Sequence, residues 1–122
     1  MLSENRRGFR SAEEELYRSY TAVENRFTEN TTIGVVVTNA KFSKAKLCKI
    51  ADMAHDGLAR SIRPVHTSAD GDSIYSVSLG SVEADADVAG SLAADVLSEA
   101  VIRAIYSSEG AYGFPAANDI HQ

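Results

Sequence analysis

The residues that could most directly support chemistry are Asn30, Thr31 and Thr32, which stand just before a β-branched run at 32–38. A hydroxyl residue between a scissile bond and a buried strand is the arrangement of an N-terminal nucleophile. Such a threonine attacks the preceding carbonyl and shifts the acyl group from nitrogen to oxygen. Hydrolysis of the ester then frees the threonine as a new N-terminus, whose α-amine acts as the base for its own hydroxyl. The simpler interpretation of two adjacent threonines is β-propensity alone.

Other residue types with chemical potential are present in patterns that favour a structural role. The G-x-S-x-G elbow, the phosphate loop and the G-x-G-x-x-G fingerprint are absent from the sequence. His55, His66 and His121 do not fall at a metal-ligand spacing, so surface or half-buried histidines are expected. Cys48 is the only cysteine, which excludes an internal disulfide and a cysteine-built metal cage. We expect neither a metal nor an organic cofactor.

The elements that must position Thr31 follow the order α-β-α-β-α. A capping-box pattern at Ser11 and Glu14 opens the first helix. Apolar spacing predicts the second helix, and the proline that follows it marks its end. The predicted elements are a helix over 11–23, a strand over 32–38, a helix from an N-cap at Ser43 to Arg63, a strand over 72–79 and a final helix preceded by Glu83, Asp85 and Asp87.

The side-chain pattern also predicts which faces are buried. The run 32–38 is expected to be buried on both faces. The strand at 72–79 should place Ile74, Ser76 and Ser78 on one face and Tyr75, Val77 and Leu79 on the other. The final helix is expected to bury Val88, Leu92, Val96, Leu97, Val101 and Ile105. Since two strands do not make a stable sheet alone, another chain or further sequence must complete it.

Size and charge narrow the class of protein. The chain has 122 residues, a single domain's worth, and a formal net charge of −5. An acidic balance argues against broad contact with nucleic-acid phosphates. No apolar stretch approaches the length of a membrane span, and the polar N-terminus does not resemble a signal peptide. We therefore expect a soluble cytoplasmic domain with neither nucleic acid nor membrane as a partner.

Several blocks of the sequence resemble one known family. The segment from Asn30 to about Gly110 is similar to the C-terminal, nucleophile-bearing portion of the L-aminopeptidase D-esterase (DmpA-type) family. The branch it resembles most is the nylon-oligomer (6-aminohexanoate oligomer) endohydrolases. The matching blocks are the Asn-Thr-Thr at 30–32, the strand at 33–37, Met-Ala-His-Asp-Gly-Leu-Ala-Arg at 53–60, Ile-Arg-Pro at 62–64 and Asp-Gly-Asp at 70–72.

The resemblance implies a fold and a set of site residues. The family fold is an α+β (αββα) sandwich shared with ornithine acetyltransferase, of which this chain would supply only the α-β-α-β-α part. Thr31 matches the nucleophile, with self-cleavage between Asn30 and Thr31. Asp70 and Asp72 match the acidic pair near the nucleophile. The alternative for these two carboxylates is a tight Asp-Gly-Asp turn leading into a strand.

One departure from the family concerns the N-terminal portion. Members carry a long segment before the nucleophile that supplies further strands and the groups that stabilise the oxyanion. The matching division here is a leader with a helix over 1–30, corresponding to the end of the α-subunit, and a β-subunit domain over 31–122. We expect the chain to need a complementary α-type chain or to associate with copies of itself.

The resulting hypothesis is the catalytic portion of a self-processing amidohydrolase or aminopeptidase that is inactive alone. Thr31 would form an acyl-enzyme with a peptide or amide substrate, and Asp70 and Asp72 would orient and polarise it. Two alternatives stay open. One is a truncated, non-catalytic family remnant that forms a small oligomeric α/β domain. The other is acyl transfer to an amine in place of water.

Overall fold

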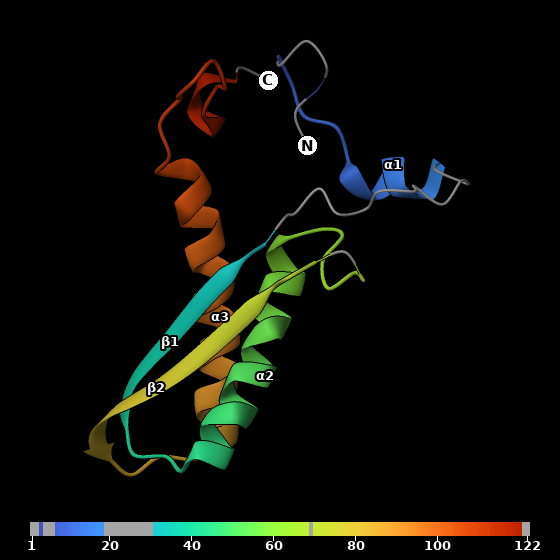
Figure 1. The fold of residues 1–122 in the computed structure, drawn as a ribbon. Coiled ribbons are helices and arrows are strands. Elements are labelled where there is room, and N and C mark those ends of the chain that lie inside the picture. Colours follow the sequence, from blue (N-terminus) through green and yellow to red (C-terminus); the bar gives the residue numbers. More distant parts are fainter. Residues whose placement is uncertain (1–2, 4–6, 19–30, 69, 121–122) are drawn as a thin grey trace.

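The fold is an α+β arrangement in which two helices cover one face of a two-stranded sheet (Figure 1). The computed structural model describes residues 3, 7–18, 31–68 and 70–120. Its elements are α1 (Ala12–Arg18), β1 (Ile33–Ala40), α2 (Lys44–Ser61), β2 (Ser73–Val82), α3 (Ala86–Tyr106) and the 3-10 turn η1 (Ala117–Asp119). The predicted α-β-α-β-α order is confirmed.

The two strands are parallel and are joined through α2, as a parallel pair requires. Their register pairs Ile33 with Ser73 and continues to Thr38 with Ser78, after which an irregularity brings Ala40 opposite Val82. Both strands begin at the same end of the sheet, beside the C-terminal end of α2 (Figure 1). The residues just before β1 and just before β2 are therefore neighbours in space.

The core lies between the sheet and the helix pair. Its buried residues are Ile50, Ala54, Leu58, Ala93 and Leu97, and half-buried Val36, Phe42, Ile62, Val65 and Ile74 are among those that pack against it. The serines on the inner face of β2 are accommodated by hydrogen bonds. Ser76 donates to the Leu47 carbonyl (2.6 Å) and Ser78 to the Ala40 carbonyl (2.5 Å). The predicted division of β2 into two faces is confirmed.

The close approach of α2 and α3 depends on small residues. A Cβ added at Gly57 would lie 2.3 Å from the Ala94 carbonyl oxygen, so only glycine permits this distance. One turn further along α2, the Ser61 hydroxyl donates to the Ser98 carbonyl (3.0 Å). Arg60 forms an ion pair with Asp95 at the solvent side of the same contact. The helix pair is thus tightly packed along its length.

The starts of α1 and α2 follow the sequence signals, whereas α3 begins at Ala86, so that Asp87 lies in its first turn and not before it, and some element ends also differ from the prediction. The hydroxyls of Ser11 and Ser43 accept from the amides of Glu14 and Lys46, and Asp85 caps α3 by accepting from the amides of Asp87 and Val88. α1 is described only to Arg18, so the predicted residues 19–23 lie outside the described residues. Both strands run past their predicted ends, to Ala40 and Val82, because they continue to pair there.

Two burial predictions are wrong. β1 is not buried on both faces, because its side chains alternate and Ile33, Val35 and Val37 are exposed. α3 does not bury its large apolar residues: of the predicted set, Leu97 is buried and Val101 half-buried, whereas Val88, Leu92, Val96 and Ile105 are exposed. The physical reason is that α3 packs against α2 through its small residues Gly90, Ala93 and Ala94, which leaves the larger stripe turned away.

Candidate active site at the start of the two strands

The parallel register brings Thr31 beside the Asp70-Gly71-Asp72 segment, which we call the acidic turn. The pairing of Ile33 with Ser73 extends backward, because the Ser73 amide donates to the Thr32 carbonyl (2.9 Å). Residues almost forty positions apart in the chain therefore meet at one end of the sheet. Thr31 is exposed, and Asp70 and Asp72 are half-buried.

Asp72 links the acidic turn directly to the residue after Thr31. Its carboxylate oxygen Oδ1 accepts a hydrogen bond from the Thr32 backbone amide at 2.8 Å. A charged acceptor strengthens such a bond relative to a neutral one. The contact fixes the Asp72 side chain on the backbone just before β1, one residue from Thr31.

Gly71 lies against the Thr31 side chain. A Cβ built on Gly71 would lie 2.9 Å from Thr31 Oγ1, closer than real Cβ contacts allow without movement. Glycine at this position therefore lets the backbone of the acidic turn approach the hydroxyl. The sequence pattern assigned Gly71 no role of its own, and its one local signal was its place between two aspartates.

Asp70 closes a short turn with Thr67. The Thr67 amide donates to Asp70 Oδ2 (2.6 Å), and the Asp70 amide donates back to the Thr67 carbonyl (3.1 Å). Thr67 was not singled out from the sequence. These two bonds set the direction from which the chain enters the acidic turn, and they are compatible with both interpretations of the Asp-Gly-Asp motif.

The predicted site residues are thus brought together in part. Thr31, Asp70 and Asp72 meet at one end of the sheet, whereas Asn30 lies outside the described residues. His55 is half-buried on α2 and His66 is exposed in the loop after it, as expected for structural histidines; His121 also lies outside the described part. Cys48 is an exposed free thiol on α2. Among the described residues there is no cluster of three or more side chains suited to hold a metal ion.

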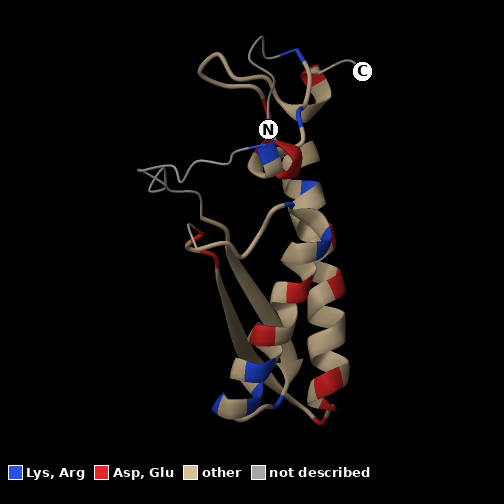
Figure 2. Cartoon of the chain, turned by 90° about the vertical axis from the view of Figure 1, so that its right-hand side faces the viewer, with Lys and Arg blue, Asp and Glu red and all other residues tan. Residues whose placement is uncertain are grey.

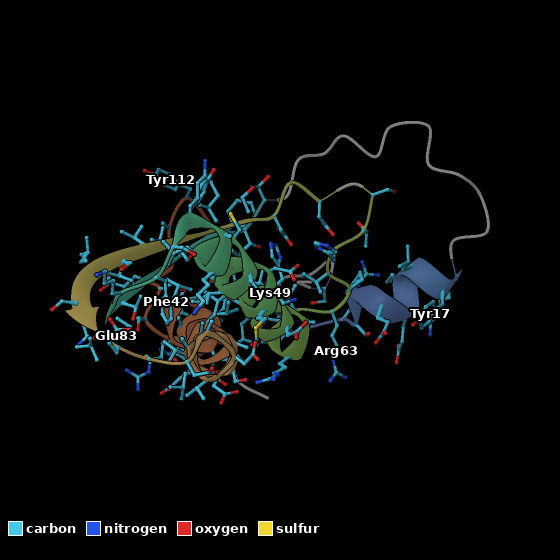
Figure 3. All side chains as sticks on the ribbon, turned by 90° about the horizontal axis from the view of Figure 1, so that it is seen from below. Tyr17, Phe42, Lys49, Arg63, Glu83 and Tyr112 are labelled. Carbon is cyan, nitrogen blue, oxygen red and sulfur yellow. The ribbon has the colours of Figure 1, made fainter. Side chains whose placement is uncertain are left out.

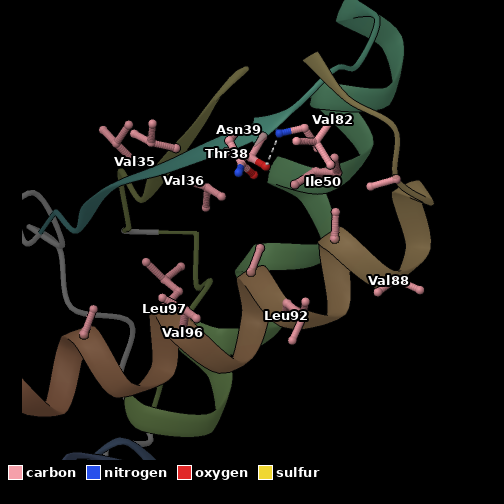
Figure 4. A pocket seen from close by; sticks show the side chains of 16 residues that line it. Val35, Val36, Thr38, Asn39, Ile50, Val82, Val88, Leu92, Val96 and Leu97 are labelled. Atoms are coloured by element: carbon pink, nitrogen blue, oxygen red, sulfur yellow. Dashed lines mark hydrogen bonds between the residues drawn. The ribbon is translucent and has the colours of Figure 1, made fainter. Parts of the chain in front are cut away.

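A second feature is an apolar groove of about 370 Å³ between β1 and α3. One wall is the β1 segment 35–40, and the other is the stripe of Val88, Leu92 and Val96 that α3 leaves exposed (Figure 4). β1 pairs with β2 along its other edge, and among the described residues no strand pairs with the edge that borders the groove.

Charge is distributed away from the sheet. Both strands are tan in Figure 2 because neither contains a charged residue, while acidic and basic residues lie along the helices. Lys44, Lys46 and Lys49 gather at the start of α2. No helix among the described residues is long and apolar enough to cross a membrane. An uncharged apolar sheet is suited to contact with protein.

Comparison with known proteins shows the family of the chain. Residues 4–118 match peptidase family S58, and the chain belongs to that family. It is 43% identical over 101 residues to an uncharacterized aminopeptidase of Mycobacterium leprae, covering 70% of this chain and 28% of that protein. For an uncharacterized aminopeptidase of Mycobacterium tuberculosis (strain H37Rv) the identity is 39% over 106 residues, with 75% and 31% covered.

A third relative is a 6-aminohexanoate-oligomer endohydrolase of Paenarthrobacter ureafaciens. It is 33% identical over 88 residues, covering 62% of this chain and 25% of that protein. The chain therefore spans less than a third of the length of these relatives. The resemblance to aminopeptidases and nylon-oligomer hydrolases is confirmed, and the matched segment corresponds to a C-terminal portion.

Proposed function

We propose that this chain is the nucleophile-bearing portion of a self-processing amidohydrolase or aminopeptidase, with Thr31 as the nucleophile. The observation that carries the proposal is the meeting of Thr31 with the acidic turn. Gly71 approaches Thr31 Oγ1 closely, and Asp72 bonds to the amide that follows Thr31. Membership of a peptidase family and the names of the relatives support the same class of reaction.

The first step of the proposed reaction is self-cleavage. The Thr31 hydroxyl oxygen attacks the Asn30 carbonyl carbon, the carbon–nitrogen bond breaks, and the proton moves to the Thr31 nitrogen, which leaves an ester. Water hydrolyses the ester, which gives a carboxylate on Asn30 and regenerates the Thr31 hydroxyl beside the amine that the acyl shift had freed. Asp72, held by the Thr32 amide, orients the Thr31 backbone, and Asp70, whose carboxylate accepts from the Thr67 amide, holds the acidic turn on which Asp72 lies.

Substrate hydrolysis follows the same chemistry with a new acyl group. The Thr31 amine takes the proton from the Thr31 hydroxyl, and the oxygen attacks the substrate amide carbon. The amine product leaves with a proton, and water then hydrolyses the acyl-enzyme to release the acid. Peptides and amide oligomers are the proposed substrates, because the relatives are named as aminopeptidases and as 6-aminohexanoate-oligomer endohydrolases.

The proposed enzyme needs a complementary α-type chain, which supplies further strands and the donors for the oxyanion. Residues 1–30 would correspond to the end of that α-subunit and residues 31–122 to the β-subunit. The groove beside β1 and the uncharged outer face of the sheet support this partner, since a parallel sheet is normally covered on both faces. Loss of a single oxyanion donor lowers the rate by about 10²–10³-fold. The isolated chain should therefore hydrolyse substrate slowly.

The test is the intact mass of the purified 122-residue chain, measured alone and after co-expression with the part of the Mycobacterium leprae relative that lies outside the matched segment. We expect a fragment that begins at Thr31, at least in the co-expressed sample. Thr31→Ala should abolish the fragment because the hydroxyl is lost, and Thr31→Ser should retain it.

Thr32→Ala is the matched control, since it removes the neighbouring hydroxyl and keeps the Thr32 amide that bonds to Asp72. It should leave cleavage within a few-fold of the wild type. A single uncleaved mass in both samples would contradict the nucleophile role. It would favour the non-catalytic alternative, a small α/β domain that uses its open sheet to oligomerise.

A further inference from the structure

The loop between α2 and β2 carries a ring contact that the proposed chemistry does not use. His66 in this loop and His55 on α2 pack with their ring centroids 5.0 Å apart and their planes at 61°. This edge-to-face arrangement is one that aromatic rings prefer. Two residues that the sequence separates by more than two helical turns are thereby joined across the start of the loop.

The helix side of this contact is rigid. His55 follows Ala54, which is fully buried, and precedes Gly57 and Leu58, which lie in the packed face of α2. The base of the loop is also held, because Ile62 and Val65 pack against the core. The part of the loop that needs a further anchor begins at His66.

The loop side of the contact is His66. His66 is exposed and has a φ of 62°, in the left-handed region that residues other than glycine seldom occupy. A residue keeps such a conformation when its surroundings hold it there. The His55 ring is the partner that the structure shows for the His66 side chain.

His66 is followed directly by the turn that sets the acidic residues. Thr67 exchanges two hydrogen bonds with Asp70, Gly71 approaches Thr31 Oγ1, and Asp72 bonds to the Thr32 amide. A continuous set of contacts therefore runs from the α2 core through the two rings to the start of β1. The two histidines lie at the α2 end of this set of contacts and not beside Thr31.

We propose that His66, packed on His55, is a positioning residue that holds the acidic turn against Thr31. The effect on catalysis rests on the proposed function of Thr31 as the nucleophile. The structural claim is that the ring contact fixes the Thr67–Asp70 turn. Loss of either ring would loosen that turn while leaving the sheet and the helix pair intact.

The experiment is amide hydrogen exchange, resolved by residue, on the 122-residue chain and on its variants His55→Ala, His55→Phe and His66→Asn. His55→Phe keeps a ring on α2. His66→Asn removes the ring but suits the left-handed backbone, so strain is not a second cause. We expect the Thr67 and Asp70 amides to exchange about three- to tenfold faster in His55→Ala and His66→Asn, and near the wild-type rate in His55→Phe.

Two results would overturn the proposal: unchanged exchange at Thr67 and Asp70 in His55→Ala, or an equal acceleration across the β1–β2 ladder, which would indicate general loosening. The same variants are then tested for cleavage before Thr31, where His55→Ala should be slower than His55→Phe. If the wild type cleaves neither alone nor after co-expression, the proposed function fails by itself. The exchange rates still decide whether the ring contact holds the turn.

Discussion

The two faces of the β1–β2 sheet carry similar apolar residues in very different surroundings. On the inner face, Val36 and Ile74 pack against the buried cluster formed by α2 and α3. The outer face is exposed and consists of Ile33, Val35, Val37, Tyr75, Val77 and Leu79. A parallel sheet normally has both faces covered. The difference indicates that the inner half provides the stability of this chain, whereas the outer half is suited to assembly.

Helix α3 repeats the same contrast within one element. Its small residues pack against α2, while Val88, Leu92 and Val96 are exposed along the groove beside β1. Helix α1, with Tyr17, lies to one side of the α2–α3 pair (Figure 3). Large exposed apolar patches on a soluble domain commonly mark contact sites for protein. The predictions below therefore compare inner positions with outer ones.

The largest contrast is expected between two leucines. Leu58 is 1% exposed and Leu79 is 75% exposed. Leu58→Ala should lower the free energy of unfolding by about 2–5 kcal/mol because it leaves a cavity in the core. Leu79→Ala should change it by no more than about 0.5 kcal/mol. Urea unfolding of both variants is the measurement, and equal losses would show that the outer face is already covered in solution.

The next contrast concerns the contact between α2 and α3. Gly57→Ala should cost about 1–3 kcal/mol of stability, because the new Cβ would lie 2.3 Å from the Ala94 carbonyl oxygen. The better helix propensity of alanine offsets up to about 1 kcal/mol of this loss of stability. Gly8→Ala is the control, since among the described residues its Cβ would meet Ser3 Oγ alone, at 3.9 Å. A Gly57→Ala protein as stable as the wild type would contradict the tight packing of this helix pair.

Adjacent residues of β1 offer a smaller but closely matched comparison. Val36 is half-buried on the inner face, and Val37 is exposed on the outer face. Replacing either valine by threonine keeps the shape and the β-propensity of the side chain and exchanges one methyl group for a hydroxyl. Val36→Thr should cost about 1 kcal/mol through burial of the hydroxyl, and Val37→Thr close to none. Thermal unfolding midpoints would reveal the difference, and a reversed order would break the assignment of the two faces.

The smallest effect is expected on the solvent side of α2. Lys49 donates to Asp52 at 2.8 Å, and this bond together with the Lys49 charge lowers the pKa of Asp52 below its ordinary value of 3.8. Figure 3 marks Lys49 on this helix. The bond to Asp52 likewise raises the pKa of Lys49 above 10.5. Exposed pairs of this kind contribute little to stability and are screened by salt.

The direction in which this pair changes stability with pH follows from the lowered pKa of Asp52. The stabilising contribution is present above the unfolded pKa of 3.8 and is lost as the pH falls through the lower folded pKa. Asp52→Asn should therefore be slightly less stable than the wild type at pH 6–7. The two proteins should converge in acid. The measurement is the melting temperature of both proteins from pH 7 into acid. A difference between the two melting temperatures that widens in acid would contradict the lowered pKa of Asp52.

Local signals in the sequence predicted the elements well. Ser43 and Asp85 cap their helices as short polar side chains do, and the alternating pattern of β2 separated its two faces correctly. The faces of β1 and α3 were predicted wrongly. Their apolar residues would suit burial on every side, and periodicity alone does not say which neighbours are present to cover them.

The candidate site could likewise be predicted from the sequence only in part. Thr31 could be selected from its position before a strand, and Asp70 and Asp72 from the family resemblance. Their proximity depends on the parallel register, which pairs Ile33 with Ser73. The close approach of Gly71 to Thr31 depends on contacts across that register, and a short sequence window carries no signal for it. The turn between Thr67 and Asp70 joins residues only three positions apart.

The sequence by itself determined the order of the elements, the starts of α1 and α2, and the residue types available for chemistry. These features depend on side chains a few positions apart, where capping, propensity and periodicity act. The tertiary structure alone decided that the acidic turn meets Thr31 and that one face of the sheet stays open. Both depend on which distant segments pack together, and that is set by the parallel pairing of β1 with β2 and by the small-residue contact of α3 with α2.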